Sequence, residues 1–192
     1  MRNLAGKDIL TERVILEIIR REMCLEESQT WVGDTNTKIP ADTRLYVVAR
    51  MVDAQPISSE SEFIPENIDG NPAELQQYIV CENIQIDIFS RNPDLLARRW
   101  EIVGALSSIY SKQKQEEYSF KIFRLPKNFV NTSGVEGGSN IIRYSATFAA
   151  NVWYKKEKVL QSPHDYFDAF GVRVDDEVSI GTPTGIIEFT ID

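Results

Sequence analysis

The chain has 192 residues, of which 42% are hydrophobic, so it is long enough to bury a core of its own. Its 21 lysine and arginine residues against 29 aspartate and glutamate residues give a net charge of −8, which disfavours a protein that grips nucleic-acid phosphates. No apolar run approaches the roughly 20 residues that cross a membrane. Residues 1–7 lack the apolar segment of a signal peptide, and Cys24 and Cys81 fit free thiols in a reducing compartment.

The first elements along the chain are a predicted helix and a predicted strand. Apolar residues recur at helical spacing over residues 8–23, which indicates an amphipathic helix. Residues 26–43 lack periodicity and are predicted as a loop, whereas apolar residues recur in alternation over residues 44–52, as in a strand. Residues 53–77 contain prolines and a serine–glutamate tract, and we interpret them as a second long loop. That loop either contacts a partner or is simply mobile.

The middle of the chain predicts a strand followed by a long central helix. Residues 78–89 alternate, with isoleucines on one face and polar residues such as Asp87 on the other. Asn92 and Pro93 are suited to start a helix, which we expect over residues 93–115. Its apolar arc is wide and includes Trp100, so we expect the helix to lie flat on a sheet with that ring buried.

The remaining segments predict further strands. Residues 120–125 and 141–154 have strand patterns, and the glycine-containing residues 126–140 between them are predicted as a long loop. Short strand-like pieces follow within residues 172–191. Because such pieces are poorly stable alone, we expect them to join a sheet edge of this subunit or of a neighbour.

These elements together predict an α+β fold. We expect a mostly antiparallel sheet on which one long central helix and one N-terminal helix pack, with long loops and a C-terminal β extension. The predicted domain covers residues 1–158 with an inserted loop at 53–77, and the extension at 159–192 is expected to contact other subunits or partners.

The sequence offers little for catalysis. His164 is its only histidine, so it would have to serve any Ser-His-Asp or Cys-His system, and a multi-histidine zinc site is excluded. The glycines at 134–138 lack the Lys-Ser/Thr ending of a phosphate loop. We therefore predict no catalytic residues, no metal site and no cofactor. An enzyme that uses His164 and Asp165 is kept as an alternative.

Three segments carry a resemblance to a known family. They are the strand end at residues 84–92, the Ala-Arg-Arg-Trp helix at 97–100 and the Arg-Tyr-Ser-Ala-Thr-Phe strand at 143–152. In the order of these elements, over about residues 8–154, the chain resembles the small neck and tail-terminator proteins of tailed bacteriophages. The resemblance is one of pattern rather than of invariant residues.

This resemblance implies a structural virion protein that forms a ring, expected to be a hexamer, on the last layer of the tail tube. The implied partners are other copies of the chain, the tail-tube protein, a head–tail connector or neck protein, and sheath protein if the tail is contractile. DNA would pass through the bore without specific binding. The protein would reside in the tail or neck of the virion after assembly in the host cytoplasm. A connector stopper or another neck or tail-completion protein is the main alternative.

Partner contacts are expected in the loops at 53–77 and 126–140 and in the last strand. Composition identifies the loops, because serine, glutamate, proline and glycine replace the apolar period there. The candidate contact residues are Glu60, Glu62, Phe63, Gly134, Glu136, Gly137, Ile186, Phe189 and Ile191.

Overall fold

A computed structural model describes residues 2–3, 10–33, 40–65, 72–136, 139–159, 171–172 and 187–188. The chain divides into two compact units. The first consists of Met1–Ser61 and Gln76–Lys156, and the second of Glu62–Leu75 and Glu157–Asp192. No described helix has both the length and the apolar character needed to cross a membrane.

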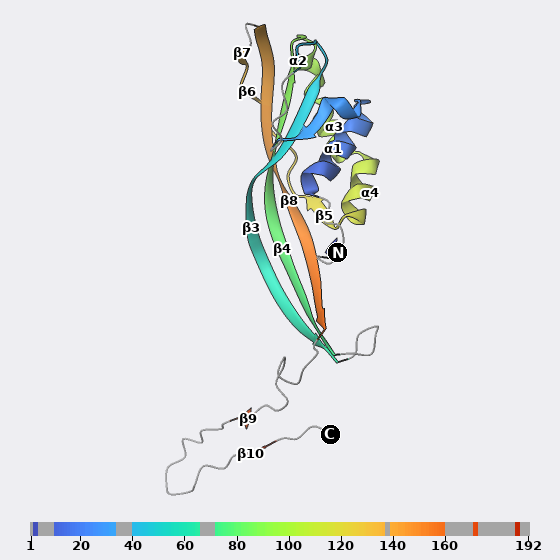
Figure 1. Ribbon diagram of the computed structural model, residues 1–192, viewed down its shortest axis with the longest axis vertical. Coiled ribbons are helices and arrows are strands. Elements are labelled where there is room, and N and C mark those ends of the chain that lie inside the picture. The colour runs from blue at the N-terminus through green and yellow to red at the C-terminus, as the bar shows by residue number, and fades with distance from the viewer. Residues whose placement is uncertain are drawn as a thin grey trace, which may run out of the picture. The chain divides into compact units, whose positions relative to one another are not determined.

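Three long strands dominate the sheet of the first unit (Figure 1). They are β3 (Tyr46–Ile64), β4 (Ala73–Ser90) and β8 (Ser139–Val159), in the order β1-β8-β4-β3-β2. The short strands β1 (Arg2–Asn3) and β2 (Thr30–Val32) run parallel to β8 and β3. Along β8, antiparallel pairing is made by β5 (Phe120–Ile122), β6 (Val130–Asn131) and β7 (Gly134–Glu136). The sheet is therefore mixed.

The helices of the first unit cover one face of this sheet (Figure 1). They are α1 (Thr11–Glu22), α2 (Leu95–Arg98), α3 (Glu101–Ser107) and α4 (Ile109–Glu117), with a 3-10 turn η1 (Glu27–Gln29) after α1. Alternate residues of β4 and β8 meet the apolar faces of α1 and α3, as the 2.0 and 3.6 residue periods require. The fully buried core includes Val14, Ile15, Ile18, Ile19, Ile84, Ile86, Ile88, Ile102, Ala150 and Val152.

A smaller cluster lies on a separate part of the sheet. Tyr46 stacks on Phe89 with ring centroids 5.6 Å apart, and Trp31 meets Phe89 edge to face at the same separation. Val48 and Ile141 complete this cluster. Residues of both parities at the start of β3 are therefore buried, from Tyr46 to Ala49.

Helix α1 ends in a left-handed residue. Cys24 has a φ of 53°, and the Leu25 N–H donates to the Arg20 carbonyl at 2.8 Å. This bond pattern is the Schellman motif, in which glycine is the usual left-handed residue because it has no Cβ. An exposed cysteine occupies that position here.

The predicted fold class is wrong. The sheet is mixed rather than mostly antiparallel, and residues 93–115 form three short helices rather than one long central helix. The interruption between α3 and α4 has a clear local cause. Ser108 has an extended backbone (φ −62°, ψ 163°), and its Oγ accepts a hydrogen bond from the Ser111 N–H at 3.0 Å. Ser108 thus caps a new helix instead of continuing the old one.

The broken helix changes which side chains are buried. Leu95 and Ile102 are in the core, as expected, but Trp100 lies between α2 and α3 and is 50% exposed. The expectation that the Trp100 ring is buried is wrong, because a helical stripe loses its phase at each interruption.

The loops predicted at 53–77 and 126–140 are also wrong. Residues 53–64 continue β3 and residues 73–77 begin β4, while residues 126–140 contain β6, β7 and the start of β8. Pro56 lies within β3 rather than ending it. The strands expected at 78–89 and 141–154 lie within β4 and β8, and the N-terminal helix is confirmed as α1.

The second unit contains one described strand pair of the C-terminal region. β9 (Gly171–Val172) and β10 (Ile187–Glu188) pair antiparallel, with Val172 opposite Ile187. Of the expected C-terminal extension at 159–192, Val159 ends β8, and the remaining residues lie outside the described ones.

Candidate assembly surface

The most unusual surface of the first unit is the middle of β3, residues 50–61, which we call the bare segment. Every one of its residues is exposed, including the apolar Val52 (57%) and Ile57 (56%). A strand that has one face on a core alternates between buried and exposed residues. The bare segment does not alternate, so both of its faces meet solvent in the isolated chain.

One edge of the bare segment is open as well. Strand β2 pairs with Val47–Ala49, and the Gly33 N–H donates to the Ala49 carbonyl at 2.8 Å. Beyond Ala49, no strand among the described residues follows β3 on this side, while β4 follows it on the other. An unpaired edge offers backbone groups and side chains to another chain.

A stacked tyrosine pair links β4 and β8, the two strands that follow β3 in the sheet. Tyr78 of β4 stacks on Tyr154 of β8, with ring centroids 5.1 Å apart and planes at 13°. The Tyr154 hydroxyl donates to a carboxylate oxygen of Glu82 at 2.9 Å, and Glu82 is buried. This pairing stabilises β4 against β8, but it covers neither face of β3.

The sheet face opposite the helices carries a polar network around Asp87. Arg143 Nη2 donates to Asp87 Oδ2 at 2.7 Å, and Gln85 Nε2 and the Ser145 hydroxyl donate to Oδ1. Arg50 Nη2 lies 4.0 Å from the same carboxylate. Burial alone would raise the pKa of Asp87, but the hydrogen bonds from Ser145, Gln85 and Arg143 and the charge of Arg143 lower it below its ordinary value of 3.8. Asp87 therefore stays charged and is the counter-charge of Arg143 on this face.

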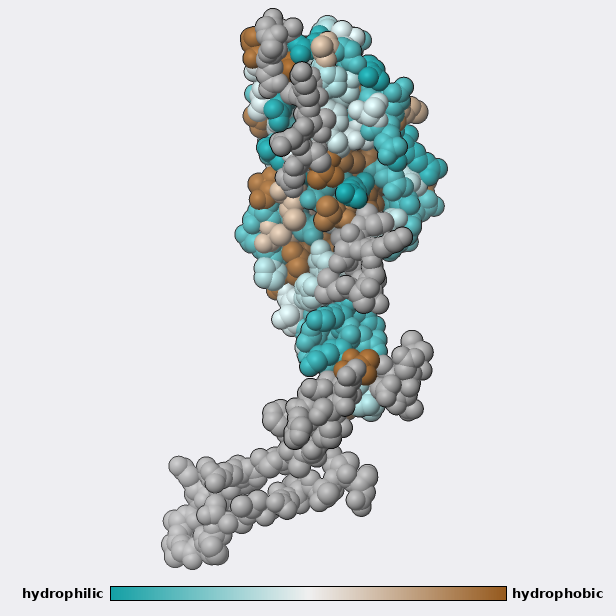
Figure 2. All heavy atoms as spheres, viewed as in Figure 1, coloured by the Kyte–Doolittle hydropathy of each residue, from teal (hydrophilic) through white to brown (hydrophobic). Residues whose placement is uncertain are grey.

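A second exposed surface combines arginine with aromatic rings. The Trp100 ring meets Phe129 edge to face at 5.2 Å. The Arg99 guanidinium lies over the rings of Tyr144 (4.6 Å) and Trp100 (5.3 Å). Phe129 belongs to the connection between β5 and β6, which also exposes Phe123, Arg124, Leu125 and Lys127. We call Arg99, Trp100 and residues 123–130 the basic aromatic patch. Figure 2 shows that on the viewed face apolar residues reach the surface in separate clusters among polar ones.

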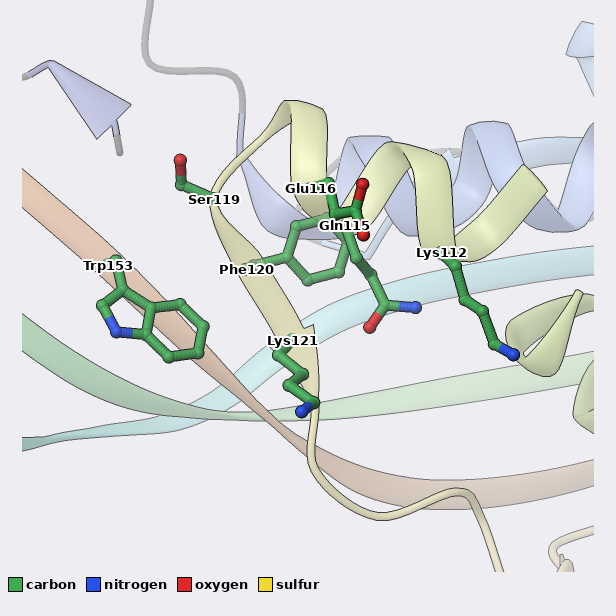
Figure 3. Close-up of a pocket in the computed structure, with 7 residues that line it drawn as sticks. All are labelled: Lys112, Gln115, Glu116, Ser119, Phe120, Lys121 and Trp153. Atoms are coloured by element: carbon green, nitrogen blue, oxygen red, sulfur yellow. The ribbon is translucent and has the colours of Figure 1, made fainter. Parts of the chain in front are cut away.

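A cavity of about 490 Å³ lies between α4, β5 and β8 (Figure 3). Its apolar wall includes Trp153, and its charged groups are Lys112, Lys121 and Glu116. Gln115 is already committed, because its Oε1 accepts from the Ile122 N–H at 2.9 Å. The lining brings together no nucleophile–base pair of the kind that acyl transfer requires. Among the described residues, no three His, Cys, Asp or Glu side chains form a metal-binding group.

The predicted contact residues lie at distant places. Glu60 lies in the bare segment, and Glu62 and Phe63 continue β3 in the second unit. Gly134 and Glu136 lie in β7, which pairs with the start of β8. Glu60, by contrast, lines a cavity together with Trp153 and Tyr154, which lie near the end of β8. The candidates outside the described residues are Gly137, Ile186, Phe189 and Ile191, together with His164 and Asp165 of the enzyme alternative.

Sequence reasoning missed the basic aromatic patch. Trp100 was assigned to a buried stripe, and although partner contacts were expected in the loop at 126–140 that holds Phe129, nothing linked that loop to Trp100. The usable signal is composition, because Arg98, Arg99, Trp100, Arg124 and Lys127 concentrate positive charge and aromatic area in an acidic chain. Aromatic residues and arginine are enriched where proteins bind each other.

A scan of protein-family models finds none that matches this chain, and a search of curated proteins finds no match either.

Proposed function

We propose that this chain is a structural, non-enzymatic protein of a tailed-phage virion, a tail terminator that forms a ring on the tail tube and joins it to the head connector. The bare segment carries the assembly part of this proposal. A strand exposed on both faces and open along one edge suits a subunit whose surface is completed by its neighbours. The phage assignment rests on the sequence resemblance at residues 84–92, 97–100 and 143–152.

The ring follows from the kind of interface that such a surface makes. When a chain uses two different surfaces to bind copies of itself, each added copy leaves the same surface open, and the series ends only when the ring closes. We expect a hexamer. The remaining partners are the tail-tube protein, the connector or neck protein and, in a contractile tail, the sheath protein.

The polar network around Asp87 suits a wall along which DNA moves. Free arginines on that wall would hold phosphates, since each neutralised phosphate adds affinity. Asp87 instead engages Arg143 at 2.7 Å and lies 4.0 Å from Arg50, so its single negative charge reduces the positive charge of these two arginines within the subunit. With a net charge of −8, the chain favours mobile rather than bound DNA.

The test is the length of tails in particles assembled without this protein. A terminator stops tube growth, so its loss should give tails of irregular length together with heads and tails that fail to join. Electron microscopy of the particles measures both. Tails of normal length that remain unjoined would contradict the terminator proposal and favour a connector stopper.

A further inference from the structure

We infer that the bare segment of one copy docks on the basic aromatic patch of the next copy. This inference rests on the proposed ring and names the two surfaces that close it. A ring needs two different, complementary surfaces on each chain. The first unit carries both, one on β3 and one formed by Arg99, Trp100 and residues 123–130.

The basic aromatic patch has groups that are ready for a partner. The Arg99 guanidinium is stacked over the rings of Tyr144 and Trp100, which holds it in place. By contrast, Arg98 is paired with Glu101 at 3.1 Å. Trp100 is half exposed and supported by Phe129. A rigid tryptophan beside an arginine is the combination that dominates binding energy at protein interfaces.

The bare segment has the opposite charge. Within its residues 50–61, Asp53 and Glu60 are negatively charged and Arg50 is the only cation. Arg50 lies at its beginning, 4.0 Å from the carboxylate of Asp87, so the middle and the end of the segment stay acidic. Val52 before Asp53 and Ile57 between Asp53 and Glu60 are exposed, and they give apolar area for aromatic rings. Charge and apolar surface thus match the basic aromatic patch.

Another copy of the chain fits the patch better than nucleic acid does. Cations on a DNA-binding surface cluster without neighbouring anions in a basic domain. Here the chain has a net charge of −8, and Arg99 and Arg124 lie over aromatic rings. Since each copy carries its own acidic strand, another copy of the chain supplies the negative charge that the basic aromatic patch lacks.

Charge reversal in the full-length chain tests this docking. The patch variant combines Arg99→Glu with Lys127→Glu, and the segment variant combines Asp53→Lys with Glu60→Lys. Each variant alone presents like charges on both surfaces, so light scattering should show the mass falling from the ring to a single chain. An equimolar mixture restores opposite charges at every contact of an alternating ring, so the ring mass should return.

Two further variants serve as controls. Arg13→Glu with Lys112→Glu makes the same change in net charge on exposed helix positions outside both surfaces, and the ring should persist. Arg124→Glu with Lys127→Glu replaces the patch variant if Arg99→Glu impairs folding, because both side chains are exposed.

The outcomes separate this inference from the proposed function. A ring that survives in both charge-reversed variants overturns the docking inference and leaves the terminator proposal standing, and so does a variant ring that only loses attachment to the tail tube. A wild-type chain that stays single at high concentration also overturns the inference. The terminator proposal is judged independently by tail length.

Discussion

The beginning of β3 and the bare segment that continues it share one strand but have different surroundings. At the beginning of β3 the side chains on both faces of the strand are buried, among them Tyr46, Val47 and Ala49. In the bare segment the side chains on both faces are exposed, among them Val52 and Ile57. The backbone is a strand throughout, because pairing with β4 accompanies β3 along the sheet. Hydrogen bonding therefore maintains the strand where burial does not.

This difference separates the stability of the isolated chain from its capacity to assemble. Burial of apolar area contributes the largest favourable free energy of folding. The buried start of β3 provides that free energy in every copy, whereas the apolar side chains of the bare segment can be buried only against a partner. Substitutions in the two regions should consequently affect different measurements.

The largest expected effect is loss of folding stability when the core is truncated. Ile86 of β4 is fully buried among α1 and α3 side chains, so Ile86→Ala should lower the free energy of unfolding by about 2–5 kcal/mol. The matched change in the bare segment, Ile57→Ala, should alter it by no more than about 0.5 kcal/mol. Urea unfolding of the isolated chain measures both.

Equal losses from these two substitutions would contradict the comparison, because they would mean that the bare segment is buried in the isolated chain. The mass of the assembled species gives the complementary readout. Ile57→Ala should weaken assembly at protein concentrations at which the unfolding of single chains is unchanged.

The next effect concerns Asp87, which links β3, β4 and β8 where the core ends. Asp87→Asn removes the charged acceptor of the Arg143 hydrogen bond and should cost about 1.5–3 kcal/mol at neutral pH. The pKa of Asp87 is lowered on folding, so its stabilisation is fully present above the unfolded pKa of about 4 and is lost as pH falls through the lower folded pKa.

The check is the free energy of unfolding measured from neutral pH down to about pH 3. The wild-type value should fall more steeply than that of the Asp87→Asn variant, and the two curves should converge in acid. A constant separation between them would show that the charge of Asp87 does not contribute.

The smallest effect is expected at Cys24, at the end of α1 and away from the bare segment. Its φ of 53° is strained for any residue with a Cβ, so Cys24→Gly should raise the free energy of unfolding by about 1 kcal/mol. As a control, Glu22→Gly within α1 should lower it by about the same amount. Thermal unfolding of the two variants should shift in opposite directions, and assembly should not change.

The sequence predicted those parts of the fold in which one face is buried. Alternation at 84–88 placed Asp87 off the core face, where the structure has it with Arg143. The bare segment was missed because a strand that is exposed on both faces needs no alternation of apolar and polar residues, and this alternation is the signal that predicts a strand. Trp100 was misassigned because the helix is interrupted beside it.

The candidate site could be predicted only in part. Composition drew attention to Glu60, which lies on the bare segment, although its contact with a partner stays a prediction. The pairing of Trp100 with Phe129 joins a helix corner to a connection much later in the chain. No local pattern encodes such a contact, since it depends on how the two segments fold together.

Pro56 has a consequence for the time before assembly. Before assembly, the open edge of a strand can pair with the same strand of another copy. Repeated pairing of this kind produces fibres. Proline has no backbone N–H, and segments that grow into such fibres lack proline, so Pro56 makes the bare segment a poorer template for that growth. Copies that accumulate before assembly would thus be less prone to such growth, and the side chains of the bare segment would stay available for the intended contact.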